Sequence, residues 1–368
     1  MPKILIVQPW FSAVGHPAQS LINTAKTIGL RGDIAYLISV IPSSDLVETA
    51  KDELQQLGEV VEYPVKTDSV REGTVKALMS IRTLLVTNFS FDQIFFLDAH
   101  LVLLAALWPF FYQKRIKRLS VTYLMGPERV ARYKIVKVLI EKFLKRKEVS
   151  LFLRTEELAI DWKRVFPQSS IKCLPSLEIP IDDVLPISSR FSHEIIQFGI
   201  LGQIRTGKSI EWLVPVFKNN PYLGKLIIAG TFNNPAQRQA LAVLEGFEGF
   251  QDKFLTEEEL LSRAIEQDYL LMLYDNWDHR MEGAVMYLAA RVNRPVIVYN
   301  KGWCGRMVHT YKNGLIAPDN RSDFGGFIKQ VPRADSVEYK HLLKGMHNFK
   351  IAHSGATALN AFLEVLQD

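Results

Sequence analysis

The sequence has few cysteines and lacks a long apolar run. Two cysteines among 368 residues cannot build a disulfide framework, and we interpret them as reduced thiols of a cytosolic protein. The most apolar stretch, residues 95–111, is interrupted by Asp98, His100 and Pro109, so it is too broken for a membrane-spanning helix. The apolar N-terminus is short and lacks the features of a signal peptide. We therefore expect a cytoplasmic protein. Peripheral attachment to the inner face of a membrane is compatible with this expectation.

Acidic residues are scarce in one region of the chain. Residues 112–148 contain twelve Lys or Arg and three Glu, although the net charge of the whole chain is only +5. Apolar residues at helical spacing fall within this region: Val130, Ile135, Val138, Leu139 and Phe143. A basic helix with an apolar stripe suits an anionic membrane surface, and a solvated outer helix face is the alternative. Aromatic residues are not interleaved with the charges, so we expect no nucleic-acid partner.

Strand and helix patterns alternate along the chain. Short apolar runs at residues 3–8, 34–40 and 93–97 predict buried strands with helical segments between them, and the same order begins again with 195–201 and 225–229. Such alternation is typical of βα units that form a parallel sheet. The loops that follow the strands then lie along one edge of each sheet. The predicted fold class is α/β, with two Rossmann-like domains that face each other across a cleft.

The predicted domain boundary lies in a proline-rich segment. Residues 167–193 carry four prolines and little helical periodicity, which is typical of a linker. We expect an N-terminal acceptor domain over 1–170, a linker over 171–193 and a C-terminal domain over 194–345. Residues 346–368 are predicted to form a helix that packs back toward the N-terminal domain.

The loop after the first strand of the second half carries phosphate-binding features. Backbone N–H groups at a helix N-terminus favour a phosphate, and Lys208, with Arg205 one turn earlier, adds positive charge. Gly202 lets the backbone approach a ligand closely. Residues 202–209 also match Gly-x4-Gly-Lys-Ser, the phosphate loop of NTPases, for which Asp275 would hold magnesium. Both interpretations place a phosphate at this corner.

Four segments in order resemble the retaining GT-B glycosyltransferases of family four. They are Phe198–Gly202 with Lys208 and Ser209, Leu226–Gly230, Phe254–Leu260 with Asp268–Leu271, and Glu282–Gly283 with Arg294–Ile297, Gly302 and Asn313–Ile316. The resemblance implies the GT-B fold and a metal-independent, hexosyltransferase-like activity. The enzyme would move a sugar from a nucleoside-diphosphate donor to an acceptor hydroxyl of a glycan, a lipid-linked or a small molecule, as in polysaccharide biosynthesis, with retention of configuration. No cofactor beyond the donor is implied.

The same resemblance implies the site residues. The donor-binding candidates are Gly202, Arg205, Lys208, Gly230, Leu255, Glu282 and Gly283. Glu282 would engage the donor sugar or stabilise charge at the reacting carbon, and His100 is the second catalytic candidate. Gly15, His16 and Asp98 are candidates for the acceptor side. Histidines do not cluster at metal-ligand spacing, so we expect no metal site.

The sequence departs from the family pattern at the second glutamate. Eight residues after Glu282 stands Ala290, and counting back from Pro295 places Leu288 at that position. Met125 stands where the family tends to have histidine. These departures keep three alternatives open, namely a non-catalytic GT-B homologue that acts as a binding partner, a sugar-nucleotide epimerase, and a P-loop NTPase.

Overall fold

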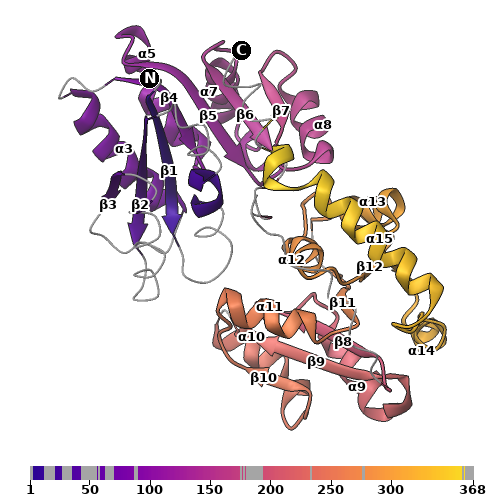
Figure 1. Ribbon diagram of the computed structural model, residues 1–368. Helices are drawn as coiled ribbons and strands as arrows, with labels where there is room; N and C mark the ends of the chain where they lie inside the picture. The colour runs from indigo at the N-terminus through magenta and orange to yellow at the C-terminus, as the bar shows by residue number, and fades with distance from the viewer. Residues whose placement is uncertain are drawn as a thin grey trace. The chain divides into compact units, whose positions relative to one another are not determined.

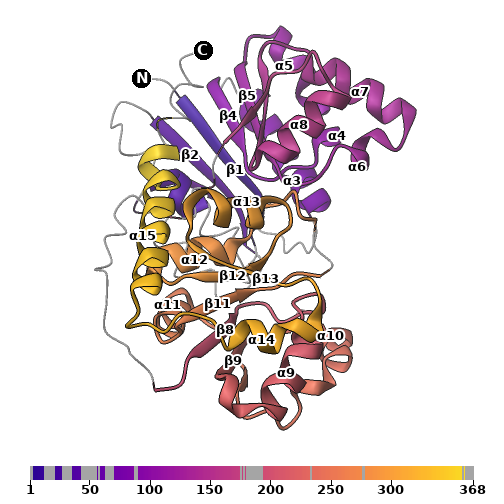
Figure 2. The same cartoon turned by 90° about the vertical axis from the view of Figure 1, so that its right-hand side faces the viewer.

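The chain forms two compact units in the computed structural model (Figures 1 and 2). The structure describes residues 3–11, 21–26, 35–42, 56, 59–62, 70–86, 90–174, 176, 179, 194–232, 234–275, 278–358 and 360. One unit comprises Met1–Ile181 with Gly355–Asp368, and the other comprises Asp182–Ser354. None of the helices within the described ranges has the length and apolar character needed to cross a bilayer.

The N-terminal unit is built on a seven-stranded parallel sheet. Its strands are β1 (Lys3–Phe11), β2 (Ala35–Pro42), β3 (Glu59–Glu62), β4 (Phe91–Phe96), β5 (Ile116–Tyr123), β6 (Val149–Leu153) and β7 (Ile171–Cys173). They lie in the order β3-β2-β1-β4-β5-β6-β7, with every neighbouring pair parallel. Ile94, Phe95 and Phe96 of β4 are fully buried, as expected for a strand covered on both faces.

Helices flank this sheet (Figure 1). They are residues 21–26, α3 (Val70–Val86), α4 (Leu101–Leu104), α5 (Trp108–Tyr112), α6 (Glu128–Ala131), α7 (Lys134–Leu144) and α8 (Glu156–Val165), with a 3-10 turn at Ala105–Leu107. The basic segment does not form the single helix that its apolar spacing predicts, because Tyr133 has an extended backbone (φ −109°, ψ 123°) and separates α6 from α7. The periodicity does not reveal this break, since residues 129–147 contain neither glycine nor proline.

The C-terminal unit contains a six-stranded parallel sheet. Its strands are β8 (Gln197–Leu201), β9 (Lys225–Gly230), β10 (Phe250–Asp252), β11 (Tyr269–Met272), β12 (Val296–Tyr299) and β13 (Gly314–Ala317). Their order is β10-β9-β8-β11-β12-β13, again with parallel pairs throughout. Both sheets therefore share the strand order of the Rossmann fold, and the prediction of two Rossmann-like domains is confirmed.

Three of the described helices in the C-terminal unit begin at side-chain caps, namely Asn234, Thr256 and Ser336. The helices of this unit are α9 (Ile210–Asn219), α10 (Pro235–Ala240), α11 (Glu257–Ile265), α12 (Ala284–Val292), α13 (Gly302–Tyr311), α14 (Phe324–Ile328) and α15 (Val337–Ala352), with 3-10 turns at Pro221–Leu223, Ala242–Leu244 and Arg321–Asp323. At the start of α11, Thr256 and Glu259 form a capping box, in which each side chain accepts a hydrogen bond from the backbone N–H of the other residue. The long terminal helix α15 ends at Ala352, earlier than the sequence suggested, and the N–H of Gly355 donates to the carbonyl oxygen of Ile179.

Aromatic packing fixes the centre of the second sheet. The ring of Phe198 on β8 stacks on Tyr269 of the adjacent β11, with 5.9 Å between ring centroids. Tyr339 of α15 packs edge-on against Tyr269 at 5.4 Å, and the Tyr269 hydroxyl donates to the Pro332 carbonyl at 2.7 Å. Since β8 and β11 are held rigidly side by side, the loops that follow them have a fixed base.

Candidate functional site

The candidate site lies at the edge of the second sheet where its parallel strands end. The strand order reverses between β8 and β11, and ligands of open α/β sheets bind outside the strand ends at such a switch point. The loop of residues 202–209 follows β8, and residues 273–283 follow β11. The fold therefore brings together two loops that are more than 60 residues apart along the chain.

Two glycines let the loop after β8 lie against β9. Gly230 ends β9 with φ at +155°, and a Cβ there would overlap the carbonyl oxygen of Gly202. Gly202 has φ at +86°, and its N–H donates to the Ala229 carbonyl at 2.9 Å. Around the position of a Gly202 Cβ there is open space within 4 Å. Gly230 is thus required for backbone packing, whereas Gly202 leaves room beside the strand end.

Side chains join the ends of β8, β11, β12 and β13. The N–H of Asp275 donates to the Gly207 carbonyl at 2.9 Å, and the Ser209 hydroxyl donates to the Asp275 carboxylate at 2.9 Å. The same hydroxyl lies 3.3 Å from the Tyr299 hydroxyl, and Arg321 donates to the Asp275 carboxylate at 3.2 Å. This network positions the start of α9, where Ser209 is held in the left-handed region (φ 60°).

Lys208 is a buried cation directly before α9. It is 7 % exposed, and its ammonium donates to the Leu201 carbonyl at 3.3 Å. Within the described ranges no carboxylate forms an ion pair with it. Burial, together with the positive charge of nearby Arg205, lowers the pKa of Lys208 to about 7. Burial also lowers the pKa of Arg205, an effect that Tyr274 opposes. An anion bound here would stabilise the charged ammonium.

Glu282 lies in the loop between β11 and α12, directly before Gly283 at the N-cap position. The hydroxyl of Tyr287, in the first turn of α12, donates to the Glu282 carboxylate at 2.6 Å. Tyr287 is 2 % exposed, and its ring lies 5.8 Å from each of the rings of Trp303 and Phe349. Because Tyr287 is packed on all these sides, it holds one oxygen of Glu282 in a fixed direction.

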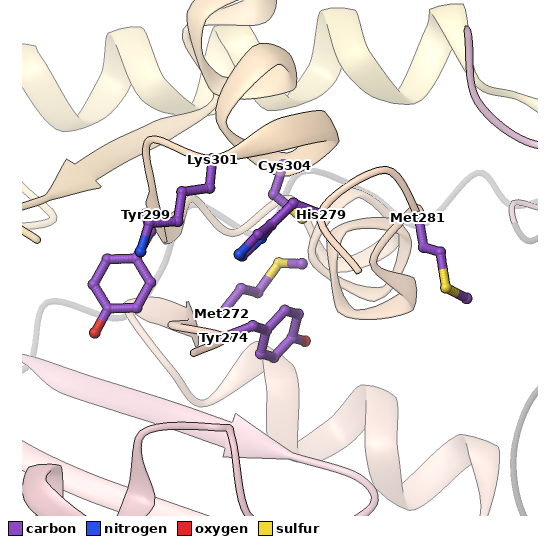
Figure 3. Close-up of a pocket in the computed structure, with 7 residues that line it drawn as sticks. All are labelled: Met272, Tyr274, His279, Met281, Tyr299, Lys301 and Cys304. Atoms are coloured by element: carbon purple, nitrogen blue, oxygen red, sulfur yellow. The ribbon is translucent and has the colours of Figure 1, made fainter. Parts of the chain in front are cut away.

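A small pocket opens in this unit beside the loop after β11 (Figure 3). It is lined by Met272, Tyr274, His279, Met281, Tyr299, Lys301 and Cys304. A Cβ at Gly283 would lie 2.5 Å from the Met272 methyl carbon and 3.2 Å from the Cys304 sulfur, so a larger residue there would displace the Met272 side chain that lines the pocket. The pocket volume of about 10 Å³ accommodates about one water molecule. The pocket alone is too small for a nucleotide sugar, and the candidate site is the whole sheet edge.

The predicted donor-binding residues all belong to the C-terminal unit. Gly202, Arg205, Lys208, Gly230, Leu255, Glu282 and Gly283 all follow or end strands at the same sheet edge. Leu255 is half-buried between β10 and the capped start of α11. Their role as ligand contacts stays a prediction.

The acceptor-side candidates belong to the N-terminal unit. Asp98 and His100 follow β4, and Asp98 takes a left-handed backbone (φ 58°). The N–H of His100 donates to the Thr74 hydroxyl at 3.1 Å. Burial lowers the pKa of His100, and the charge of Arg71 adds to this, so the imidazole is neutral at pH 7. Gly15 and His16 lie outside the described residues.

The structure adds residues that the sequence did not indicate. Tyr287 contacts Glu282, which lies five residues earlier in the chain, whereas Arg321 contacts Asp275 over a separation of 46 residues, and neither was among the candidates predicted from the sequence. The sequence does carry a signal for Lys301 and Arg321, because each is a basic residue that follows closely after the end of a strand. Lys301 follows β12, and Arg321 follows β13. Among the described residues no group of three His, Cys, Asp or Glu side chains is placed to hold a metal ion.

Comparisons with known proteins identify the fold. No family model matches the sequence, and a search of curated proteins finds no significant match. A glycosyltransferase from Rickettsia africae matches with a TM-score of 0.70 at 12 % identity, covering 100 % of this chain and 98 % of that chain. Anabaena HepE in complex with UDP and glucose matches with a TM-score of 0.72 at 14 % identity over 100 % of both chains.

An epimerase shares the architecture at a lower score. A UDP-GlcNAc 2-epimerase from Neisseria meningitidis, bound to UDP-GlcNAc, matches with a TM-score of 0.57 at 13 % identity over 100 % of both chains. At these identities the likeness establishes the fold. The fold class predicted from the sequence, α/β of the GT-B type, is confirmed.

Proposed function

We propose that this chain transfers a sugar from a nucleoside-diphosphate donor to an acceptor hydroxyl, with retention of configuration and without a metal ion. Lys208 and Arg205 neutralise the leaving diphosphate, and Glu282 engages the donor sugar or stabilises charge at its reacting carbon. His100 and Asp98 serve the acceptor side. The donor itself carries the activated sugar, so the reaction needs no further cofactor.

One observation carries this proposal: the buried ammonium of Lys208, before the N-terminus of α9, has no carboxylate partner among the described residues. A desolvated cation beside a helix N-terminus favours a multiply charged anion. Solved structures of the same fold include Anabaena HepE in complex with UDP and glucose and in complex with UDP-glucose. A nucleoside diphosphate is therefore the anion that the proposal places at this edge.

Calorimetry on the full chain tests the proposal with UDP, UMP, GDP, ADP and their sugar conjugates. We expect one diphosphate to bind at least about tenfold more tightly than its monophosphate, because only the diphosphate reaches Lys208 with a second phosphate, and tenfold equals about 1.4 kcal/mol. The best conjugate should yield a glycoside when acceptors are added. Absence of binding by every member of the panel would support the non-catalytic homologue instead.

The contact of Tyr287 with Glu282 gives a second prediction. Tyr287→Phe removes the 2.6 Å hydrogen bond but keeps the buried ring. We expect kcat for sugar transfer to fall about tenfold, because a hydrogen bond to a charged group is worth about 1.5–3 kcal/mol. The affinity for free UDP, which has no sugar to contact Glu282, should stay within about twofold.

Tyr222→Phe is the matched control for this change. Tyr222 is exposed, and its hydroxyl donates to the side chain of Asn220 at 2.9 Å. Both variants lose one tyrosine hydroxyl, but only Tyr287→Phe should slow transfer. Equal kcat in the two variants, at equal thermal stability, would contradict a positioning role for Tyr287.

Two other activities have specific support. The epimerase fold match favours epimerisation of free nucleotide sugar, which would proceed with no acceptor present. The 2.9 Å contact between Ser209 and Asp275 is the pairing that an NTPase would use for magnesium, so ATP or GTP hydrolysis that requires magnesium would establish that activity. Product analysis of the calorimetry samples separates epimerisation from sugar transfer, and parallel samples with ATP or GTP, with and without magnesium, test for hydrolysis.

A further inference from the structure

Helix α7 has an apolar face that its own unit does not cover. Ile140, Phe143 and Leu144 are buried, so one side of α7 is anchored to the N-terminal unit. On the other side Ile135, Val138 and Leu139 are 85 %, 45 % and 38 % exposed. These three residues share one stripe of the helix. The single apolar stripe predicted from the sequence is therefore two faces, one buried and one exposed.

Aromatic and basic residues extend this exposed face. Tyr133, directly before α7, is 60 % exposed, and the Arg132 guanidinium lies 5.7 Å from its ring centre. Residues 128–147 contain eight Lys or Arg and two Glu. The exposed face consists of Tyr133, Ile135, Val138 and Leu139, and we call it the α7 face. Figure 2 shows α6 and α7 next to each other on the side of the N-terminal unit away from β1.

The charges around the α7 face point outward. Lys134 and Lys142 are exposed, and neither forms an ion pair with a described residue. By contrast, Lys145 pairs with Glu141 at 2.7 Å, and the Arg146 guanidinium lies 5.1 Å from the Trp108 ring centre. The face thus combines exposed apolar side chains with unpaired ammonium groups at its margin.

We propose that the α7 face docks on an anionic lipid bilayer. An apolar stripe inserts between headgroups while flanking lysines contact lipid phosphates, as in helices that lie in a membrane interface. A second copy of this chain fits the face poorly, because a symmetric contact would bring the same lysines together. This proposal goes beyond the sugar transfer proposed above and does not depend on it, because docking requires no donor.

Sedimentation with vesicles tests this surface on the full chain. We expect binding to vesicles with about 30 % phosphatidylglycerol, at least about tenfold stronger than to phosphatidylcholine alone, and weakened in about 0.5 M salt. Ile135→Ser combined with Leu139→Ser should lower the partition coefficient at least about tenfold, equal to about 1.4 kcal/mol. Lys134→Gln combined with Lys142→Gln should lower it on anionic vesicles only.

Ile160→Ser is the control, since Ile160 on α8 of the same unit is 58 % exposed. It should leave binding within about twofold of the unchanged chain, and all variants should unfold at the same temperature. Equal binding to neutral and anionic vesicles, or equal loss in the Ile160 variant, would overturn the proposal. So would a concentration-dependent dimer that the Ile135 and Leu139 substitutions abolish, because the face would then belong to a self-contact.

Discussion

The affinity for UDP is expected to fall about tenfold between about pH 8 and pH 9. Burial and the charge of Arg205 lower the pKa of Lys208 to about 7, so the ammonium has lost its proton in most free molecules above pH 8. A bound diphosphate favours the charged form and raises this pKa again. Binding of UDP then includes uptake of a proton. The association constant for UDP therefore decreases as the proton concentration decreases. The terminal phosphate of UDP, with a second pKa near about 6, adds no slope in this range.

Calorimetry in buffers of different ionisation enthalpy measures this uptake directly. At pH 8 we expect about 0.9 proton taken up for each UDP bound, which is the deprotonated share for a pKa of about 7. The same shift affects stability. The unfolded chain keeps the lysine proton up to the ordinary value of 10.5, so the Lys208 contribution to the free energy of unfolding rises with pH between about 7 and 10.5. Below pH 7 both states are protonated and this contribution stays at its minimum.

Three variants distinguish Lys208 from other groups. Lys208→Met should bind UDP weakly with no proton uptake, and Lys208→Arg should lose the pH dependence because a guanidinium stays charged throughout this range. Lys225→Met is the matched control, since Lys225 is exposed and begins β9 at the opposite sheet edge. The Lys225→Met variant should still lose about tenfold in UDP affinity between about pH 8 and pH 9. Proton uptake that persists in Lys208→Met would show that another group titrates.

The sequence was sufficient to predict the fold because the strands of both sheets are short, apolar and separated by helical segments. β11 is buried on both faces and is a continuous apolar run, and in β4 the buried residues from Ile94 to Phe96 form such a run after Asp92 and Gln93. β7 was missed because Ile171–Cys173 has only three residues and lies at the start of the proline-rich segment. α13 was missed because Gly302 and Gly305 interrupt its pattern; Gly302 has φ at +51°, and a Cβ there would overlap the His279 carbonyl oxygen.

The candidate site was predictable where it is local in sequence. Gly202, Arg205 and Lys208 belong to one strand, loop and helix start, so their spacing carries information about a phosphate. The pKa of Lys208 was not predictable, because it depends on how deeply the surrounding loops bury the ammonium. The contact between Tyr287 and Glu282 depends on the rotation of α12 against α13 and α15, which the sequence pattern leaves open.

Glu282→Gln is expected to lower kcat/KM for the sugar donor about 100- to 1000-fold. Glutamine keeps a side-chain oxygen that accepts the hydrogen bond from the Tyr287 hydroxyl, so the loop should retain its shape. What the variant loses is the negative charge, and removing a preorganised electrostatic group from an active site costs about 2.7–4 kcal/mol in the transition state. Steady-state kinetics with the best donor from the calorimetry panel measures this loss.

Binding measurements decide where the lost charge acts. The affinity of Glu282→Gln for UDP should stay within about twofold of the unchanged chain, because the diphosphate contacts assigned to Lys208 and Arg205 remain. Glu258→Gln is the matched control, since Glu258 is exposed in the first turn of α11. If Glu282→Gln transfers sugar as fast as Glu258→Gln, the carboxylate takes no part in the reaction. If it also loses UDP, Glu282 supports the loop that holds the diphosphate, and its assignment to the sugar is wrong.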